Sequence, residues 1–302
     1  EWNLEKFPVA DRHTMPSWLA AIASLQGWDG LMLYGYSQSA LNSLVNGSNY
    51  SSYNDPSLMA MMPAAALLYR QQHVDIARQH YRLQLPAEVF FGEAINADNS
   101  ATIRTLLEQS RLTIDVQHLN KLPWLSGQAP ALANVAKVAE NPPLIITDAN
   151  KDYIAADQQF VAADTGQIKR NWQTGILTID SPQSQIMSGN IGQESYQLSS
   201  SEFHIETQSA VVAIQSLNEK PISDALEILI SKIGHSLPVS RPSSAFVVEP
   251  IIGDILIKAP AGLKLYSLNS NGKRQQLDVG YQNGAYHIRL DASQQSPWLL
   301  LH

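Results

Sequence analysis

Residues 14–36 read TMPSWLAAIASLQGWDGLMLYGY and combine the signals of one helix and one buried strand. Thr14 can cap a helix, Pro16 suits its first turn, and Gly27 ends the Ala-rich body that follows. The short apolar and aromatic run at 30–36 is typical of a strand buried on both faces of a parallel sheet. A helix followed by such a strand predicts an α/β architecture near the start of the chain.

A polar stretch and a second helix follow. Residues 37–54 are rich in Ser, Asn, Tyr and Gly, which favour loops and turns. Asp55-Pro56 then places a capping residue before a proline at the first helical position. Because SLMAMMPAAALLYR at 57–70 is apolar on nearly every face, we expect a helix covered by neighbours and kinked at Pro63. This order of helix, strand, long loop and helix is typical of an α/β barrel.

The pattern of predicted elements changes twice in the rest of the chain. Residues 86–165 combine an expected helix at 100–109 with strand-like pieces, and we interpret them as a connecting region. From residue 166 onward, short alternating runs follow one another with turn residues between them, which predicts an antiparallel sandwich. Asn271-Gly272 and Asn283-Gly284 are the strongest hairpin signals.

Composition and charge exclude several classes of function. The formal net charge is −7 with Lys and Arg scattered singly, so we expect no nucleic-acid partner. No cysteine is present, which excludes disulfides, thiolate metal ligands and a cysteine nucleophile. The apolar run at 58–68 contains a proline and is shorter than the roughly 20 residues of a membrane-spanning helix, so we expect no span. The dispersed histidines predict no metal site, and no cofactor motif is present.

Several segments together carry a resemblance to a known class of enzymes. They are Glu1-Trp2-Asn3, FPVADR at 7–12, QGWDGLMLYGYS at 26–37, NDPSLMAMMPAAALLYR at 54–70 and GILTIDSPQSQIMSG at 175–189. The pattern resembles the end of the catalytic barrel of retaining glycoside hydrolases of the large clan A type, followed by their C-terminal β-domain. The resemblance touches most of the chain, but only residues 1–70 bear on catalysis.

The resemblance implies an α/β plus all-β protein made of three parts. Residues 1–85 would form the end of a (β/α)8 barrel, residues 86–165 a connecting region, and residues 166–302 a C-terminal antiparallel β-sandwich. It also implies a secreted or periplasmic enzyme in which an upstream barrel segment of the same protein packs against this one. We therefore expect the chain to be a fragment of something longer.

The same resemblance assigns the first carboxylate of the chain to catalysis. Glu1 takes the place of the nucleophile at the tip of the seventh barrel strand, and Trp2 and Asn3 begin the next loop. A retaining glycosidase needs this carboxylate about 5 Å from a second carboxylic acid, which protonates the leaving oxygen. That acid, a Glu preceded by Asn, is expected upstream of residue 1, since Asn218-Glu219 suits a turn between sandwich strands. The alternative is that Glu1 is an exposed terminal residue without a role.

Aromatic residues near the eighth strand are the other candidates for sugar contact. Trp28, Tyr34 and Tyr36 offer flat apolar faces to sugar rings, and Asp29 can bind a sugar hydroxyl. Along a strand Tyr34 and Tyr36 point the same way, and Tyr36 is nearer the end. Alternatively, the rings belong to the core and Asp29 caps a turn. The loop at 46–54 would overhang the same face, or it is simply solvated.

Two functions from different classes follow. The first is hydrolysis of a β-linked poly- or oligosaccharide with retention of configuration, in which this chain supplies half of the site. The second is non-catalytic: residues 166–302 bind carbohydrate or pack against the barrel as a structural module. Packing is favoured, because Trp172 and Trp298 are too isolated to form an aromatic row. A pseudoenzyme or a bare scaffold is a third hypothesis that a fold resemblance does not exclude.

Overall fold

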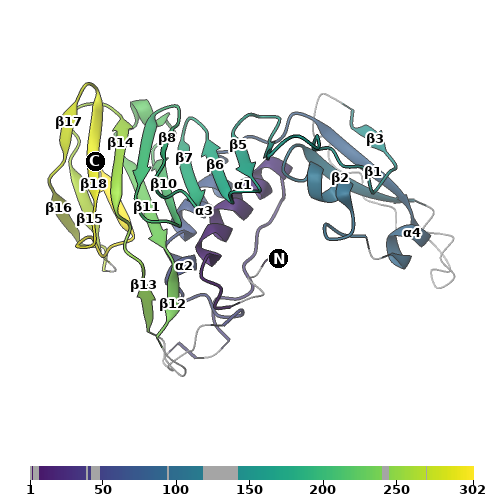
Figure 1. The fold of residues 1–302 in the computed structure, drawn as a ribbon, viewed down its shortest axis with the longest axis horizontal. Coiled ribbons are helices and arrows are strands. Elements are labelled where there is room, and N and C mark those ends of the chain that lie inside the picture. The colour runs from purple at the N-terminus through teal and green to yellow at the C-terminus, as the bar shows by residue number, and fades with distance from the viewer. Residues whose placement is uncertain are drawn as a thin grey trace.

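The computed structural model describes residues 2, 7–38, 40–41, 48–93, 95–117, 142–239, 245–269 and 271–302. Strands dominate, and most of them belong to antiparallel sheets. Two packed sheets lie toward one end of the molecule and a smaller α/β unit lies at the other (Figure 1).

The large sheet has nine strands in the order β16-β15-β19-β11-β10-β7-β6-β5-β4. Its strands are β4 Phe160–Ala162, β5 Ile168–Asn171, β6 Ile176–Asp180, β7 Ser184–Gly189, β10 Ala210–Ser216, β11 Ile228–Gly234, β15 Leu265–Leu268, β16 Arg274–Leu277 and β19 Trp298–Leu301. The small sheet has five strands in the order β17-β18-β14-β9-β8. They are β8 Ser195–Gln197, β9 Ser201–Ile205, β14 Gly253–Lys258, β17 Gly280–Gln282 and β18 Ala285–Leu290. The antiparallel character predicted for this part of the chain is confirmed.

Alternate residues of the central strands pack on opposite faces of the large sheet. In β10, Val212 and Ile214 pack in one core with residues of the small sheet such as Phe203. Val211 and Ala213 belong to a second core on the other face, which helices cover. All residues of β10 are therefore buried. This explains why the run AVVAIQS lacks the alternation of polar and apolar residues that is typical of a sheet with one solvent-exposed face.

Helices α1 (Met15–Gln26) and α3 (Met62–Arg70) cover that other face (Figure 1). Ile22 of α1 and Leu68 of α3 pack with Ile186 of the sheet. A short 3-10 turn, η1 (Arg12–Thr14), leads into α1. Gly27 ends α1 with a left-handed φ of 65° and donates its N–H to the Ser24 carbonyl. The predicted helix and its glycine stop are confirmed.

The single kinked helix predicted for residues 56–70 is instead two helices. α2 (Pro56–Met59) ends before Ala60, and α3 begins at Met62 with Pro63 in its first turn. Proline has no N–H to donate to the carbonyl four residues earlier, and its ring crowds that carbonyl. The helix is therefore interrupted before Pro63 rather than bent at it.

The regular strand predicted at residues 30–36 is wrong. All of these residues are described, and they form only an isolated parallel bridge, between Leu33 and Trp2. A strand needs a hydrogen-bonding partner along its length, and within the described ranges only Trp2 forms a β-bridge with this segment. No portion of a closed barrel is seen in the residues that the structure describes.

Residues 80–149 contain a small parallel sheet with the order β2-β1-β3. Its elements are β1 His80–Pro86, α4 Ala87–Gly92, α5 Ala101–Leu106, β2 Arg111–Gln117 and β3 Leu144–Ile146. The helix expected within residues 100–109 is confirmed, and the hydroxyl of Ser100 caps it by accepting the Ile103 N–H at 3.2 Å. We call this region the α/β unit.

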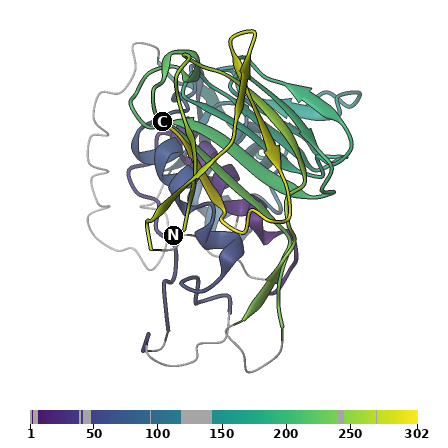
Figure 2. The same cartoon turned by 90° about the vertical axis from the view of Figure 1, so that its left-hand side faces the viewer.

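Both predicted Asn-Gly hairpins are present. The hairpin of β15 and β16 turns near Asn271-Gly272, and that of β17 and β18 turns at Asn283-Gly284. Asn283 and Gly284 have φ values of 54° and 80°, as a type I′ turn requires. A further sheet of two strands, β12 (Ser236–Pro238) with β13 (Phe246–Val248), extends away from the sandwich (Figure 2). A 3-10 turn, η3 (Ile222–Asp224), precedes β11.

None of the helices in the described ranges is long and apolar enough to cross a membrane.

Candidate functional site

The start of the chain lies beside the segment that was predicted to be the eighth strand. The Trp2 N–H donates to the Met32 carbonyl at 2.8 Å, and the Tyr34 N–H donates to the Trp2 carbonyl at 2.9 Å. These bonds hold Trp2 in parallel register with Leu33. The structure thus brings together two candidates, Trp2 and Tyr34. Glu1 and Asn3 lie outside the described residues.

Four tyrosines line this segment and the loop that follows it, and we call them the tyrosine rim: Tyr34, Tyr36, Tyr50 and Tyr53. The rings of Tyr34 and Tyr50 meet edge to face with centroids 6.0 Å apart, and those of Tyr36 and Tyr53 do so at 5.8 Å. Tyr34 is 48% exposed and Tyr36 is 56% exposed. The rim therefore presents aromatic surface to solvent instead of burying it in a core.

Backbone hydrogen bonds fix the loop on the predicted strand segment. The N–H groups of Ser52 and Tyr53 donate to the Tyr36 carbonyl at 3.1 and 3.0 Å. The Ser52 hydroxyl donates to the Gly35 carbonyl at 3.1 Å. The described part of the loop, residues 48–54, therefore lies against the aromatic segment. Because the segment is not a strand, strand alternation does not orient Tyr34 and Tyr36, and each contacts a different ring of the loop instead.

Trp28 and Asp29 lie at the end of α1. The Trp28 N–H donates to the Ala23 carbonyl at 3.0 Å, and the Trp28 carbonyl accepts the Tyr69 hydroxyl at 2.6 Å. The Trp28 ring is 40% exposed, and Asp29 is exposed. Neither residue is buried in the core, so both side chains are open to a ligand.

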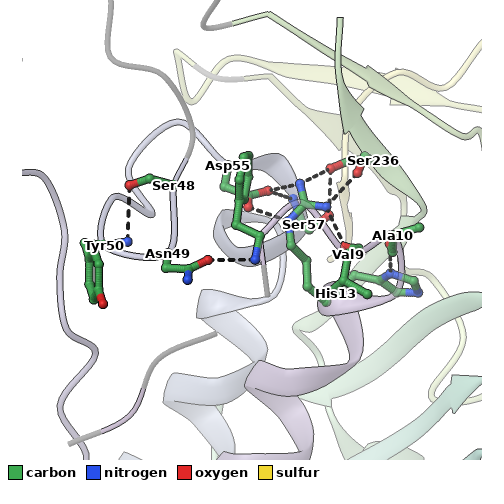
Figure 3. Close-up of polar contacts among 11 residues, drawn as sticks. Val9, Ala10, His13, Ser48, Asn49, Tyr50, Asp55, Ser57 and Ser236 are labelled. Carbon is green, nitrogen blue, oxygen red and sulfur yellow. Dashed lines mark hydrogen bonds and ion pairs between the residues drawn. The ribbon is translucent and has the colours of Figure 1, made fainter. Parts of the chain in front are cut away.

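A buried ion pair lies beside the loop that carries Tyr50 (Figure 3). The Arg12 guanidinium donates through Nε to Asp55 Oδ2 at 2.6 Å and through Nη2 to Asp55 Oδ1 at 2.8 Å. Its Nη1 also donates to the Ser236 carbonyl at 2.6 Å. Both side chains of the pair are almost fully buried. Bidentate geometry and additional carbonyl acceptors are what a buried guanidinium needs.

This pair fastens three segments that are far apart in the sequence. Arg12 belongs to the FPVADR stretch, Asp55 caps α2 by accepting the Ser57 N–H at 3.0 Å, and Ser236 begins β12. The Ser57 and Ser236 hydroxyls also lie 2.7 Å apart. We call this group the Arg12 network. It positions the loop that carries Tyr50 and Tyr53.

Side chains on either side of the Arg12 network complete the support. The Phe7 N–H donates to Asn49 Oδ1 at 2.6 Å, which ties the FPVADR stretch to the loop (Figure 3). The guanidinium carbon of Arg12 lies 5.2 Å from the Phe7 ring centroid. Burial lowers the pKa of His13 to about 4, so this histidine is neutral near pH 7. It is an uncharged packing residue next to the charged pair.

The sequence pattern assigned Asp55 only the role of a helix cap and assigned no role to Arg12, although both lie in segments that carry the resemblance. The available signal was the pair of adjacent charged residues, Asp11 and Arg12, after the apolar residues 7–10. No group of three or more His, Asp or Glu side chains within the described ranges is arranged to hold a metal ion.

No protein-family profile, curated protein or solved structure matches the chain.

Proposed function

We propose that the chain supplies part of the active site of a retaining glycoside hydrolase that acts on β-linked poly- or oligosaccharides. Residues 1–85 would form the end of its (β/α)8 barrel. The observation that carries the proposal is the parallel bridge between Trp2 and Leu33, which holds the start of the chain beside the tyrosine rim. A carboxylate next to exposed aromatic rings suits a site in which a sugar stacks while its anomeric carbon is attacked.

In the proposed reaction, Glu1 attacks the anomeric carbon while a Glu upstream of this chain protonates the leaving glycosidic oxygen. The glycosidic C–O bond breaks, and an ester forms between Glu1 and the sugar. The upstream residue then takes a proton from water, which cleaves the ester and restores the Glu1 carboxylate. We propose that the sugar-binding residues are Trp2, Asn3, Trp28, Asp29, Tyr34 and Tyr36.

The exposure of the rim also supports an upstream partner segment. Met32, two residues before Tyr34, is 67% exposed, a large value for an apolar side chain. An upstream segment of the same protein that packs against this part of the chain would cover Met32. We also propose that the protein is secreted or periplasmic, where polysaccharide substrates are found.

A structural role for the C-terminal sandwich is favoured by one observation. The large sheet buries one face against the small sheet and the other against α1 and α3. The central strands of this sheet are covered on both faces, so they support the helices and offer no surface to a polysaccharide. Within the proposed enzyme, the sandwich would therefore hold the rim segment and its helices in place.

Replacement of the proposed nucleophile in the full-length protein tests this function. Glu1→Gln removes the charge but keeps the side-chain shape. Because a retaining glycosidase cannot form its covalent intermediate without this carboxylate, we expect turnover to fall by at least about a thousandfold. The measurement is release of reducing sugar from a panel of β-linked oligosaccharides.

A matched control and a rescue experiment make the result specific. Glu93→Gln changes a carboxylate just after α4 and should leave turnover unchanged. Azide, a small external nucleophile, should restore turnover to Glu1→Gly and yield a glycosyl azide. Full activity in Glu1→Gln, or no turnover by the wild-type protein on the whole panel, would contradict the proposal.

A further inference from the structure

A cavity lies where the α/β unit meets the large sheet. Its volume is about 390 Å³, and α5, the loop at residues 152–156, β5 and the turn after β5 line it. Small-molecule sites in proteins typically have volumes of about 300–1,000 Å³. The cavity is therefore large enough for one small ligand, and it shares no residue with the proposed active site.

An ion pair forms a fixed part of its wall. Arg170 of β5 donates through Nε to Glu108 Oε2 at 2.6 Å, and its Nη2 donates to Glu108 Oε1. Glu108 is buried, and the hydrogen bond to it raises the pKa of Arg170. Because the two partners hold each other in a bidentate arrangement, they are oriented before any ligand arrives.

Two further charged side chains in the wall are able to form hydrogen bonds with a ligand. Asp152 accepts the Ile154 N–H at 2.8 Å through Oδ1, and within the described ranges its Oδ2 has no donor. Arg104 of α5 is exposed and has no ion-pair partner among the residues that the structure describes. The cavity wall thus contains one free hydrogen-bond acceptor, Asp152 Oδ2, and one guanidinium with several donors, that of Arg104.

The apolar part of the wall is aromatic. Trp172 follows β5, and its side chain is 38% exposed beside Ile154. A partly exposed indole offers a flat face to a ligand with an apolar side.

The balance of charges indicates the class of ligand. The wall contains two arginines and two carboxylates, so its formal charges cancel. A phosphate or a sugar acid would be repelled by the carboxylates of Asp152 and Glu108, which lie beside the arginines. A cation would be repelled by the two arginines in the same way. A neutral molecule with many hydroxyl groups and an apolar face satisfies the donors, the acceptors and the indole together.

We propose that this cavity binds one ring of a neutral saccharide, with the ring stacked on Trp172 and its hydroxyls bonded to Arg104 and Asp152. The site is non-catalytic and does not depend on the assignment of Glu1. In a polysaccharide-degrading enzyme it would hold a second part of the polymer.

Nuclear magnetic resonance of the tryptophan indole N–H groups tests the proposal directly. The chain has six tryptophans, and Trp172→Phe identifies the Trp172 signal by its loss. The protein is titrated with cellobiose, β-mannobiose and β-xylobiose to about 10 mM, roughly ten times a Kd of about 1 mM. We expect at least one disaccharide to shift the Trp172 signal saturably. The Trp298 signal should not move, because its Nε1 donates to the Ala60 carbonyl at 2.9 Å in a part-buried position.

Two arginine variants separate a ligand contact from a general effect. Arg104→Ala should weaken binding about tenfold, the loss expected for a hydrogen bond from a charged donor. Arg274→Ala removes an exposed arginine from β16 and should leave affinity unchanged. Both positions are exposed, so both variants should fold, and the remaining indole signals report this.

The same titrations give the outcomes that would overturn the proposal. They are no shift with any of the three disaccharides, a shift with glucuronate or inorganic phosphate alone, or unchanged affinity in Arg104→Ala. Glu1→Gln should bind the disaccharides at this cavity as the wild-type chain does. Loss of hydrolysis and loss of this binding are therefore distinguishable.

Discussion

The Arg12–Asp55 pair shows how one buried contact can determine the arrangement of a surface site. The two residues are separated by 43 positions in the chain, and Ser236 lies 224 positions from Arg12. Removing both charges from water is costly, and the close bidentate geometry offsets that cost. The main effect of the pair is therefore to fix the position of the FPVADR stretch relative to the loop of the tyrosine rim, and its net contribution to stability is smaller.

Breaking this pair from one side should be strongly destabilising. Asp55→Asn keeps the shape and the cap of α2 but leaves the Arg12 charge buried without a counterion. We expect a loss of about 3–5 kcal/mol in the free energy of unfolding, measured by chemical denaturation. The double variant with Arg12→Met should lose less than the sum of the two single variants, because no charge is then left unpaired.

An exposed ion pair provides the comparison for this prediction. Asp254 and Arg289 also form an ion pair, but Arg289 is largely exposed. Asp254→Asn should therefore have little effect on unfolding. Equal losses for Asp55→Asn and Asp254→Asn would show that the burial of the Arg12 network has no energetic consequence.

Residues of the candidate site were predictable only where a local pattern marks them. Trp28, Tyr34 and Tyr36 stand out as aromatic residues in a short apolar run, and the structure leaves all three partly exposed. Arg12 did not stand out, because its role depends on Asp55 and Ser236, which no local pattern connects to it. The Trp172 cavity was missed for the same reason, since its wall is built from segments between residues 104 and 172.

Elements with strong local signals were predicted well, and elements that depend on distant partners were not. α1, α5 and both Asn-Gly hairpins follow from local helix and turn signals. The parallel sheet of the α/β unit requires β1 to pair with β2 and β3, which are separated from it in sequence by helices and loops. At residues 30–36 the apolar run predicted a strand, but pairing decides whether a strand forms.

A glycine at the start of β14 provides an element-scale prediction. Gly253 has φ 147°, and a Cβ there would lie 2.3 Å from the His204 carbonyl oxygen of the neighbouring strand. Gly253→Ala must therefore displace backbone in the small sheet. We expect it to lower the free energy of unfolding by at least about 2 kcal/mol, measured by chemical denaturation.

Two other glycines distinguish the destabilisation caused by a steric clash from that caused by the left-handed backbone conformation. Gly284→Ala is also strained, with φ 80°, but a Cβ there meets no atom within 4 Å, so a loss of about 1 kcal/mol is expected. Gly92→Ala has neither problem and should be close to neutral. If Gly253→Ala behaved like Gly284→Ala, the close approach of β14 and β9 would not constrain this position.

At the scale of the whole molecule, the helices near the start of the chain and the sandwich share one core. Ile22 of α1 packs with Ile186 of β7 and Val211 of β10, and Trp298 of β19 donates to the Ala60 carbonyl between α2 and α3. A segment whose apolar face is buried only against a distant sheet has little reason to fold alone. We therefore expect these helices and the sandwich to unfold in a single cooperative step.

Ile22→Ala tests this cooperativity, because it creates a cavity in the helix side of the shared core. The expected loss is about 2–5 kcal/mol, and hydrogen exchange of the β10 amides should speed up by the same free energy. Leu83→Ala makes a comparable cavity in the separate core of the α/β unit, so its effect on β10 exchange should be smaller. Unchanged β10 exchange in Ile22→Ala would mean that α1 can detach while the sandwich stays folded. In that case the tyrosine rim would not be held by the sandwich, and a separate support for the proposed sugar site would be needed.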